Sequence, residues 1–253
     1  MDILVCVKRV PETGAKITVT ADGQDVETRN LGFTISPHEE CAVEEAVQLI
    51  EKHGGSATVL TLGPDPATEQ LRGALAMGID HAILLETGGE EWGSMATAQA
   101  IVTAVQTQET SFDMILFGNE AADTGGYQVG IRVAHALDWP CVTGIKSLRV
   151  EGDTAVAQRE ATGGWEEYEV TLPAVFSVKE GINLPRYPSL PGKLRAKKKP
   201  IARSEPQKSD DGLVKLQLKT PKEQESNVVV LGNGADAASK VVELLQEMGV
   251  ISS

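Results

Sequence analysis

Residues 57–85 read ATVLTLGPDPATEQLRGALAMGIDHAILL, a complete strand–helix–strand pattern. An apolar run ends at Gly63-Pro64, an apolar stripe at helical spacing follows over 67–77, and a second apolar run occupies 81–85. Two strands joined by such a helix lie parallel, because the helix carries the chain back across the sheet. This segment therefore predicts a parallel α/β fold.

The same alternation continues on both sides of this segment. Further apolar runs and stripes predict strands at 3–7 and 114–117 and helices at 37–52, 95–106 and 129–137. Pro37 in a first helical turn, with acidic residues just after it, is typical of a helix start. Strands and helices that alternate in this way predict a doubly wound, mostly parallel sheet.

After residue 140 the pattern changes to strand, turn, strand. Strands are predicted at 143–150, 154–159, 165–170 and 174–178, and we expect them as antiparallel additions to the sheet. Residues 203–226 are polar and charged, which is typical of an extended arm; a last strand (227–231) and helix (235–248) follow. We expect a main α/β domain over 1–202 and an arm over 203–253 whose terminal strand and helix dock on a partner subunit.

Composition excludes several classes of protein. The chain has 253 residues and a net charge of −13, whereas a general nucleic-acid-binding protein needs a basic surface. Its three cysteines lie far apart and form no Cys/His cluster, which argues against disulfides and against a metal site. No apolar run approaches the roughly 18 residues that span a membrane, and no targeting segment is seen. We expect a cytoplasmic protein of a bacterium or archaeon, not an integral membrane protein.

The loop after the strand at 114–117 is the strongest functional signal. Residues 118–130 read GNEAADTGGYQVG, with four glycines and two carboxylates, and a helix follows. Parallel α/β sheets hold ligands at their carboxyl edge, and the free amides at a helix start suit a phosphate. A merely flexible loop is the alternative, but a loop of this length is usually functional. A nucleotide or phosphate site is therefore predicted in the main domain.

No catalytic constellation is found in the sequence. It contains no Walker A motif and no G-x-S-x-G elbow, and too few residues follow the GNGADA stretch at 232–237 for a dinucleotide fingerprint. The histidines are expected to be structural, with His38 the one placed to touch a ligand. The glutamate pairs 39/40 and 44/45 most simply form a solvated helix face.

A basic segment reverses the charge of the chain locally. From Arg186 to Arg203 there are seven basic residues and no acidic one, with Tyr187, Leu190 and Leu194 among them. A solvated tail or a nucleic-acid contact would also explain the charge. Prolines that hold the segment extended and expose a leucine favour protein docking, with Leu190 as the anchor inside an electrostatic rim. The alternative for Leu190 is that it packs into its own sheet.

Five motifs run through the chain. They are VCVKRVP (5–11), SPHEECAVEEAV (36–47), ALAMG (74–78), LDWP (137–140) and LPRYPSLPGKLRAKKKP (184–200). Together they resemble the electron transfer flavoprotein β-subunit family over nearly the whole chain. The last motif is the most specific, because it is similar to the family's recognition loop over its full length, and it places that loop at 183–200.

This resemblance implies one subunit of an αβ heterodimer. In the family, the α subunit carries the redox FAD, and the β subunit holds a structural AMP. The β subunit also docks partner dehydrogenases through the recognition loop, and electrons continue to a quinone oxidoreductase. In electron-bifurcating members a second FAD replaces the AMP and NADH donates the electrons. The implied role is an electron carrier with no catalytic residue in this subunit.

The resemblance also assigns residues to both sites. Its implied cofactor-binding residues are Cys6, Ser36, Pro37, His38, Glu39, Leu62, Gly118, Ala121, Asp123, Gly125, Gly126, Tyr127, Gln128 and Val129. Its implied docking residues are Arg186, Tyr187, Leu190, Pro191, Lys193, Leu194, Arg195 and Lys197. Ser36 stands where the family commonly has Asn, and Val129 stands where AMP-binding animal proteins have Thr. AMP and FAD therefore stay alternatives.

A second class of protein competes with this family. A stand-alone adenine-nucleotide-binding stress or signalling module, similar to universal stress proteins, would account for residues 1–140. It would leave the antiparallel strands, the basic segment and the C-terminal arm without a role.

Overall fold

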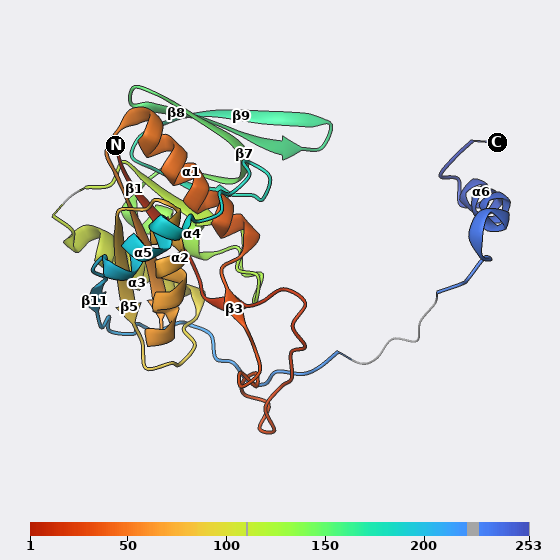
Figure 1. The fold of residues 1–253 in the computed structure, drawn as a ribbon, viewed down its shortest axis with the longest axis horizontal. Helices are drawn as coiled ribbons and strands as arrows, with labels where there is room; N and C mark the ends of the chain where they lie inside the picture. The colour runs from red at the N-terminus through yellow and green to blue at the C-terminus, as the bar shows by residue number, and fades with distance from the viewer. Residues whose placement is uncertain (110, 222–227, 253) are drawn as a thin grey trace. The chain divides into compact units, whose positions relative to one another are not determined.

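The computed structural model describes residues 1–109, 111–221 and 228–252. The chain divides into two compact units, Met1–Gln217 and Leu218–Ser253. The first unit contains the sheet and five of the α-helices (Figure 1). The second contains the 3-10 turn η2 (Gly234–Ala237) and α6 (Ala238–Glu247). Each unit is described by itself.

A nine-stranded sheet forms the centre of the first unit. In sheet order its strands are β11 (Ala202–Ser204), β5 (His81–Glu86), β4 (Ser56–Gly63), β1 (Asp2–Cys6), β6 (Met114–Gly118), β10 (Ala174–Val178), β7 (Cys141–Glu151), β8 (Thr154–Ala161) and β9 (Gly164–Thr171). The pairs from β11 to β7 are parallel, and β7–β8–β9 are antiparallel. A separate small ribbon pairs β2 (Val10–Pro11) with β3 (Phe33–Thr34). The doubly wound α/β expectation is confirmed.

Helices cover both faces of the sheet. One core cluster joins α1 (Pro37–His53), α2 (Thr68–Met77) and α5 (Leu190–Lys198) to strand residues such as Ile3 and Val5. The other joins α3 (Ser94–Thr107) and α4 (Val129–Leu137) to the alternate residues Leu4 and Cys6. Both faces of β1 are thus buried, because successive side chains of a strand point to opposite faces. A short 3-10 turn, η1 (Asp65–Ala67), precedes α2.

Helix α1 shows why the sequence folds as it does at this point. Ser36 is its N-cap, with an extended backbone, and Pro37 fills the first helical position. The Ser36 hydroxyl accepts the Glu39 N–H, while the Glu39 carboxylate accepts the Ser36 N–H, which makes a capping box. Gly54 ends the helix with a φ of 75°, which a side chain would resist. The N-terminus of α1 is thereby fixed beside the end of β1.

The expectation that residues 174–178 form an antiparallel addition was wrong. Strand β10 lies between β6 and β7, is parallel to both, and is buried at all five positions. The chain runs out along β7, returns through the β8–β9 hairpin and then inserts β10 into the sheet. Alternation along the sequence shows that a strand exists, but it does not show which strands it pairs with. The antiparallel part is confirmed for β7, β8 and β9.

The expectation that prolines hold the basic segment extended was also wrong from Leu190 onward. Helix α5 begins at Leu190, with Ser189 as its N-cap and Pro191 in its first turn. Proline is tolerated there because the first amides of a helix have no partner inside it. Ala196 is buried in the core cluster of α1 and α2, which fixes the helix against the sheet. The basic run is therefore helical.

Residues 203–217 remain with the first unit. The sequence placed a boundary at 202, whereas the division by contacts falls after Gln217. Strand β11 pairs with β5, and farther along Asp211 accepts the N–H groups of Gly93 (3.0 Å) and Ala96 (2.9 Å). Gly93 is the N-cap of α3 and has no side chain that could cap the helix. The carboxylate of Asp211 caps it instead.

The second unit contains a helix, as expected, but not the expected strand. Residues 228–231, the described part of the expected strand, have no strand conformation. Val229 and Val230 are exposed, and neither η2 nor α6 contains a buried residue. β-branched residues favour an extended chain, but a strand also requires a neighbouring strand.

Candidate functional site

The sheet has a topological switch point between β1 and β6. From β1 the chain proceeds through β4 and β5 on one side, and β6 is then added on the other side of β1. Loops that follow adjacent strands diverge at such a point, and the crevice between them is where doubly wound sheets bind ligands. The loop after β6 is the glycine-rich segment 118–130 singled out in the sequence.

Glu39 ties the end of β1 to the start of α1. One of its carboxylate oxygens accepts the Lys8 N–H at 2.8 Å, and the other accepts the Ser36 N–H at 2.8 Å. Burial raises the pKa of this carboxyl to about 7, against the effect of these donors. A Cβ atom at Gly118 would lie 2.7 Å from Cγ of Glu39, so only glycine lets β6 end this close.

The loop after β6 turns back on itself. The Gly125 N–H donates to the Ala121 carbonyl at 2.8 Å, and the Thr124 N–H donates to Asp123 at 2.8 Å. Gly125 and Tyr127 both have a positive φ, 57° and 53°. The amides of residues 124 and 125 are thus used within the loop. The sequence predicts the phosphate contact over the amides of residues 123–129, and those of residues 126–129, which lead into α4, stay candidates for it.

Lys8 connects the loop to β1. Its ammonium lies 2.7 Å from Oδ2 of Asp123, and both side chains are partly exposed. Lys8 was not among the site residues predicted from the sequence. Its position directly after the first strand was the available signal, because residues that follow adjacent parallel strands meet at one edge.

His38 connects the loop to a more distant segment. Its Nδ1 accepts the Glu180 N–H at 2.7 Å, so Nε2 carries the proton in this arrangement and lies 3.5 Å from Oε1 of Glu120. Glu180 follows β10, which is the neighbour of β6. His38 therefore contacts both the loop after β6 and the loop after β10.

The other expected cofactor residues differ in how far they are exposed to solvent. Cys6 is buried at the end of β1, and burial raises the pKa of its thiol far above its ordinary value. Leu62 is half-buried in β4, and Pro37 is exposed. Gln128 accepts two N–H groups of Arg132, and Val129 packs in the α3–α4 cluster. The structure thus brings together the ends of β1 and β6 and the start of α1.

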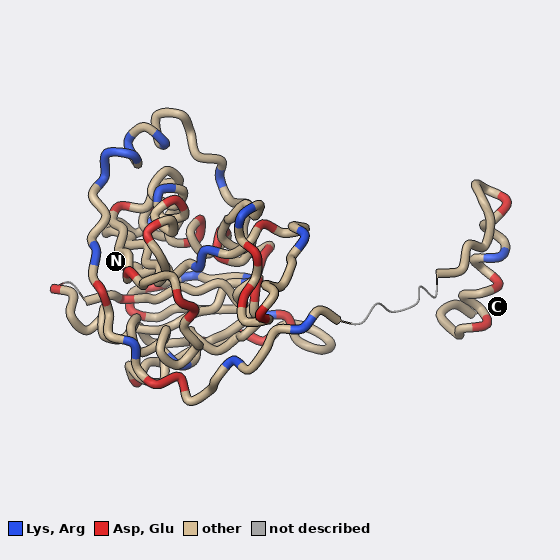
Figure 2. Tube along the Cα trace, turned by 90° about the horizontal axis from the view of Figure 1, so that it is seen from below, with Lys and Arg blue, Asp and Glu red and all other residues tan. Residues whose placement is uncertain are grey.

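A second candidate site is the basic segment at 184–199. Tyr187 is 98% exposed and Leu190 is 71% exposed, and Leu194 also faces solvent. Further exposed members are Leu184, Pro191, Lys193, Arg195 and Lys197. Figure 2 shows basic positions gathered along this part of the chain. An apolar residue exposed among cations matches the expected docking surface in its composition.

Arg186 differs from the exposed members of this segment, because its side chain forms ion pairs within the chain. It donates to Glu44 and to Glu51, both on α1. The expectation that the pairs 39/40 and 44/45 form a solvated helix face was wrong: Glu39, Glu44 and Glu45 are buried and Glu40 is half-buried. Helical periodicity cannot reveal a pairing across more than a hundred residues of sequence, so these partners were not foreseen.

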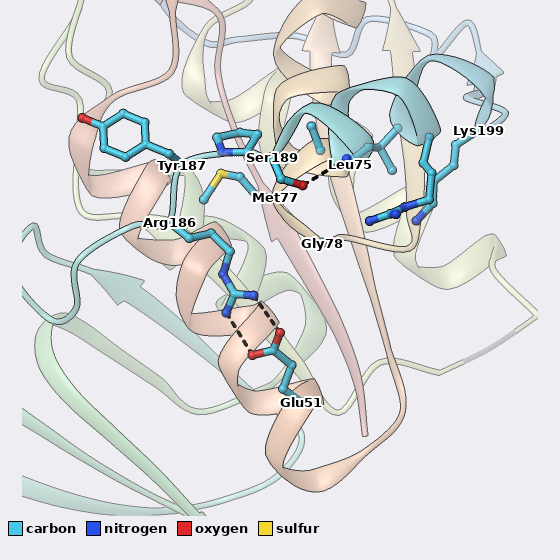
Figure 3. Close-up of a pocket in the computed structure, with 12 residues that line it drawn as sticks. Glu51, Leu75, Met77, Gly78, Arg186, Tyr187, Ser189 and Lys199 are labelled. Carbon is cyan, nitrogen blue, oxygen red and sulfur yellow. Dashed lines mark hydrogen bonds and ion pairs between the residues drawn. The ribbon is translucent and has the colours of Figure 1, made fainter.

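A pocket of about 370 Å³ lies beneath the same segment. It is bounded by the end of α2, including Met77 and Gly78, and by residues from Arg186 to Lys199 (Figure 3). The segment therefore bridges a hollow on the surface.

Comparison with known proteins gives the family of the chain. Residues 25–209 match the model of the electron transfer flavoprotein domain. The chain is 37% identical over 97% of its length to the electron transfer flavoprotein subunit beta of Bacillus subtilis, covering 98% of that protein. It is 36% identical to the subunit of the same name from Syntrophomonas wolfei, covering 97% of this chain and 96% of that one. A third, from Bradyrhizobium diazoefficiens, is 35% identical over 99% of this chain and all of its own length.

The chain belongs to the electron transfer flavoprotein β-subunit family. The segment 184–200, whose motif carries the resemblance in the sequence, includes all of α5 and the residues just before it. Among the described residues, no group of three or more His, Cys, Asp or Glu side chains could hold a metal ion. Within the same residues, no helix is both long and apolar enough to cross a membrane.

Proposed function

We propose that this chain is the β subunit of a heterodimeric electron transfer flavoprotein, a cytoplasmic electron carrier. Its partner subunit would carry the redox FAD, and the chain itself would hold a structural AMP at the β1–β6 switch point. The basic segment 184–199 would dock partner dehydrogenases, with transfer onward to a quinone oxidoreductase. Membership of the family supports this role, and so does the absence of a catalytic constellation in the sequence.

The meeting of loops at the β1–β6 switch point is the observation that carries the proposal. It combines the glycine-rich loop after β6, the start of α4, and His38, which contacts both Glu120 of that loop and the Glu180 N–H. A Cβ atom on Gly125 would meet no other atom within 4 Å, so the loop leaves room for a ligand at that point. These residues fit a nucleotide phosphate, because backbone amides at a helix N-terminus attract anions.

Each residue has a defined part in this proposal. The amides of residues 126–129 would bind the phosphate, while Glu39 holds the end of β1 and the start of α1 at a fixed separation. The Lys8–Asp123 ion pair neutralises a carboxylate that would otherwise repel the phosphate. The flavin of the partner subunit supplies the redox chemistry when it is bound. This chain binds, orients and docks.

Purification with a co-expressed α subunit tests the nucleotide site. We expect a roughly 1:1 heterodimer from which acid extraction releases one FAD and one AMP. Two FAD and no AMP would instead identify the electron-bifurcating form, with NADH as donor. A heterodimer that releases flavin from the α subunit and no second nucleotide would refute the proposed site.

A pair of glycine variants assigns that nucleotide to the loop. Gly126→Val places a branched side chain at the expected phosphate contact, where a Cβ atom would lie 3.6 Å from Oγ of Ser94. We expect it to lower the nucleotide content of the heterodimer at least about tenfold. Gly88→Val is the matched control, because a Cβ atom there meets nothing within 4 Å and the backbone is not left-handed. Equal nucleotide content in both variants would place the nucleotide elsewhere.

A further inference from the structure

Arg186 is held by two carboxylates of α1. Its guanidinium donates Nε–H to Glu44 at 2.9 Å and Nη2–H to the other oxygen of Glu44 at 3.1 Å. It also donates two parallel hydrogen bonds to Glu51, at 2.7 and 2.9 Å. The backbone N–H of Arg186 donates to Glu44 as well, at 3.1 Å. Main chain and side chain of one residue are thus fixed to the same helix.

Arg186, Glu44 and Glu51 form a clamp with one buried and one exposed carboxylate, because Glu51 is 55% exposed. The Glu44 side chain is 4% exposed, and Arg186 is its ionic partner. Burial raises the pKa of the Glu44 carboxyl, but the hydrogen bonds from Arg186 and Gln48 outweigh it, and the net shift is downward. Hydrogen bonds to Glu51 and then to Glu44 raise the pKa of Arg186, so it stays charged. A buried carboxylate of this kind requires its cation.

Asn183, three residues before Arg186, is also bonded to α1. The Asn183 amide donates to Glu45 at 2.8 Å and to the Cys41 carbonyl at 3.1 Å. Segment 183–186 is therefore attached to α1 at both ends, through Asn183 and through Arg186.

Beyond Arg186 the chain has little support of its own. Tyr187 and Ser189 lie over the pocket of about 370 Å³ shown in Figure 3. The next anchor is α5, where the Ser189 hydroxyl accepts the Gly192 N–H at 3.1 Å and Arg72 donates to the Ala196 carbonyl. The three residues between the anchors bridge the hollow, so their conformation depends on the two ends.

We propose that Arg186 is a positioning residue that presets the docking segment, and that it is not itself a contact with the partner. This inference rests on the proposed docking function only for the identity of the partner. A flexible segment loses conformational entropy when it is bound, and a segment held beforehand in its bound form avoids that cost. The clamp thereby presents Tyr187 and Leu190 to a partner in one conformation.

Glu51→Gln separates positioning from charge. If Arg186 were a free docking cation, removing the acid beside it would strengthen attraction to an acidic partner. If Arg186 is a positioning residue, the same change weakens docking, because it removes one of the carboxylates that hold the guanidinium. The two roles predict opposite signs. Lys193→Gln removes a cation of the same segment outside the clamp, so it is the control for the exchange measurement below and not for docking.

Hydrogen exchange of the heterodimer is the first measurement. We expect amides over 184–190 to exchange at least about fivefold faster in Glu51→Gln and in Arg186→Lys than in the native complex, and at the native rate in Lys193→Gln. Lysine keeps the charge but cannot make two bidentate pairs. Native exchange rates in both clamp variants would overturn the proposal, whether or not the chain docks dehydrogenases.

Electron transfer from a dehydrogenase that reduces the native heterodimer is the second measurement. We expect Glu51→Gln and Arg186→Lys to raise KM for the heterodimer about three- to tenfold, with kcat unchanged. Their effects should not add, because each breaks the same clamp. A lower KM for Glu51→Gln would overturn positioning. If no dehydrogenase reduces the native heterodimer, the proposed function is contradicted. The clamp is then tested by hydrogen exchange alone.

Discussion

Glu39 is a buried carboxyl at the point where β1, α1 and β6 meet, and its pKa is raised to about 7 by burial. The protonated form is thus favoured in the folded chain. A raised pKa contributes stability that is present below the unfolded value of 4.5 and is lost as the pH rises through 7. The loss is about 3 kcal/mol of unfolding free energy.

Glu39→Gln removes this titration. From pH 4 to pH 8, we expect the native chain to lose about 3 kcal/mol more unfolding free energy than the variant loses. Urea denaturation at each pH would measure this. Glu27→Gln, an exposed site, is the control and should run parallel to the native profile. Parallel profiles for Glu39→Gln would show that the buried carboxyl does not titrate in this range.

Leu190 lies in the first turn of α5 with most of its surface exposed. Leu190→Ala should leave the melting temperature and nucleotide content of the heterodimer unchanged, because few contacts within the chain are lost. It should weaken docking to a partner dehydrogenase by about 1–3 kcal/mol, the usual loss for an anchoring side chain. Leu213→Ala, an equally exposed site outside the segment, is the control. A large fall in melting temperature would place Leu190 in the core instead.

At the scale of elements, α3 takes its N-terminal cap from a residue far along the chain. Asp211 accepts two N–H groups of the first turn of α3, next to the loop that carries Gly126. Asp211→Ala should lower the unfolding free energy by about 1 kcal/mol, since a capping carboxylate also interacts favourably with the helix dipole. Urea denaturation would measure it, with Asp210→Ala as control, because Asp210 accepts only a local amide among its described bonds. Equal losses of unfolding free energy in the two variants would show that Asp211 does not stabilise α3 as a cap.

The elements were predictable to different degrees. Strong periodicity was enough for α1, α2, α3 and α4, and the glycine-rich loop located the switch point. Strand pairing was not predictable for β10, because its five buried residues suit either orientation. Partners of single charges, such as Lys8 with Asp123 or Arg186 with Glu44, were also missed. Those pairs are set by the tertiary fold, which brings distant residues together without a local signal.

At the scale of the whole molecule, the two units contribute unequally to stability. Residues 218–253 contain a helix with no buried residue. A chain ending at Gln217 should therefore keep the melting temperature of the isolated full chain to within about 2 °C, by calorimetry. With a co-expressed α subunit, the shortened chain should give much less heterodimer, because a helix that exposes apolar side chains such as Val241 and Leu244 is typical of an interface. A large fall in melting temperature would show that the terminal unit supports the main one.

The insertion of β10 between β6 and β7 has a consequence for synthesis on the ribosome. Strand β6 is complete at Gly118, but the strand that covers its outer edge begins only at Ala174. At ordinary elongation rates of about 5–20 residues per second, that edge stays open for roughly 3–10 s in the nascent chain. An uncovered apolar strand edge is a template for pairing with other chains. Translation speed across the β7–β9 region, and chaperones that bind extended apolar segments, should therefore influence the yield of this protein more than they influence its final stability.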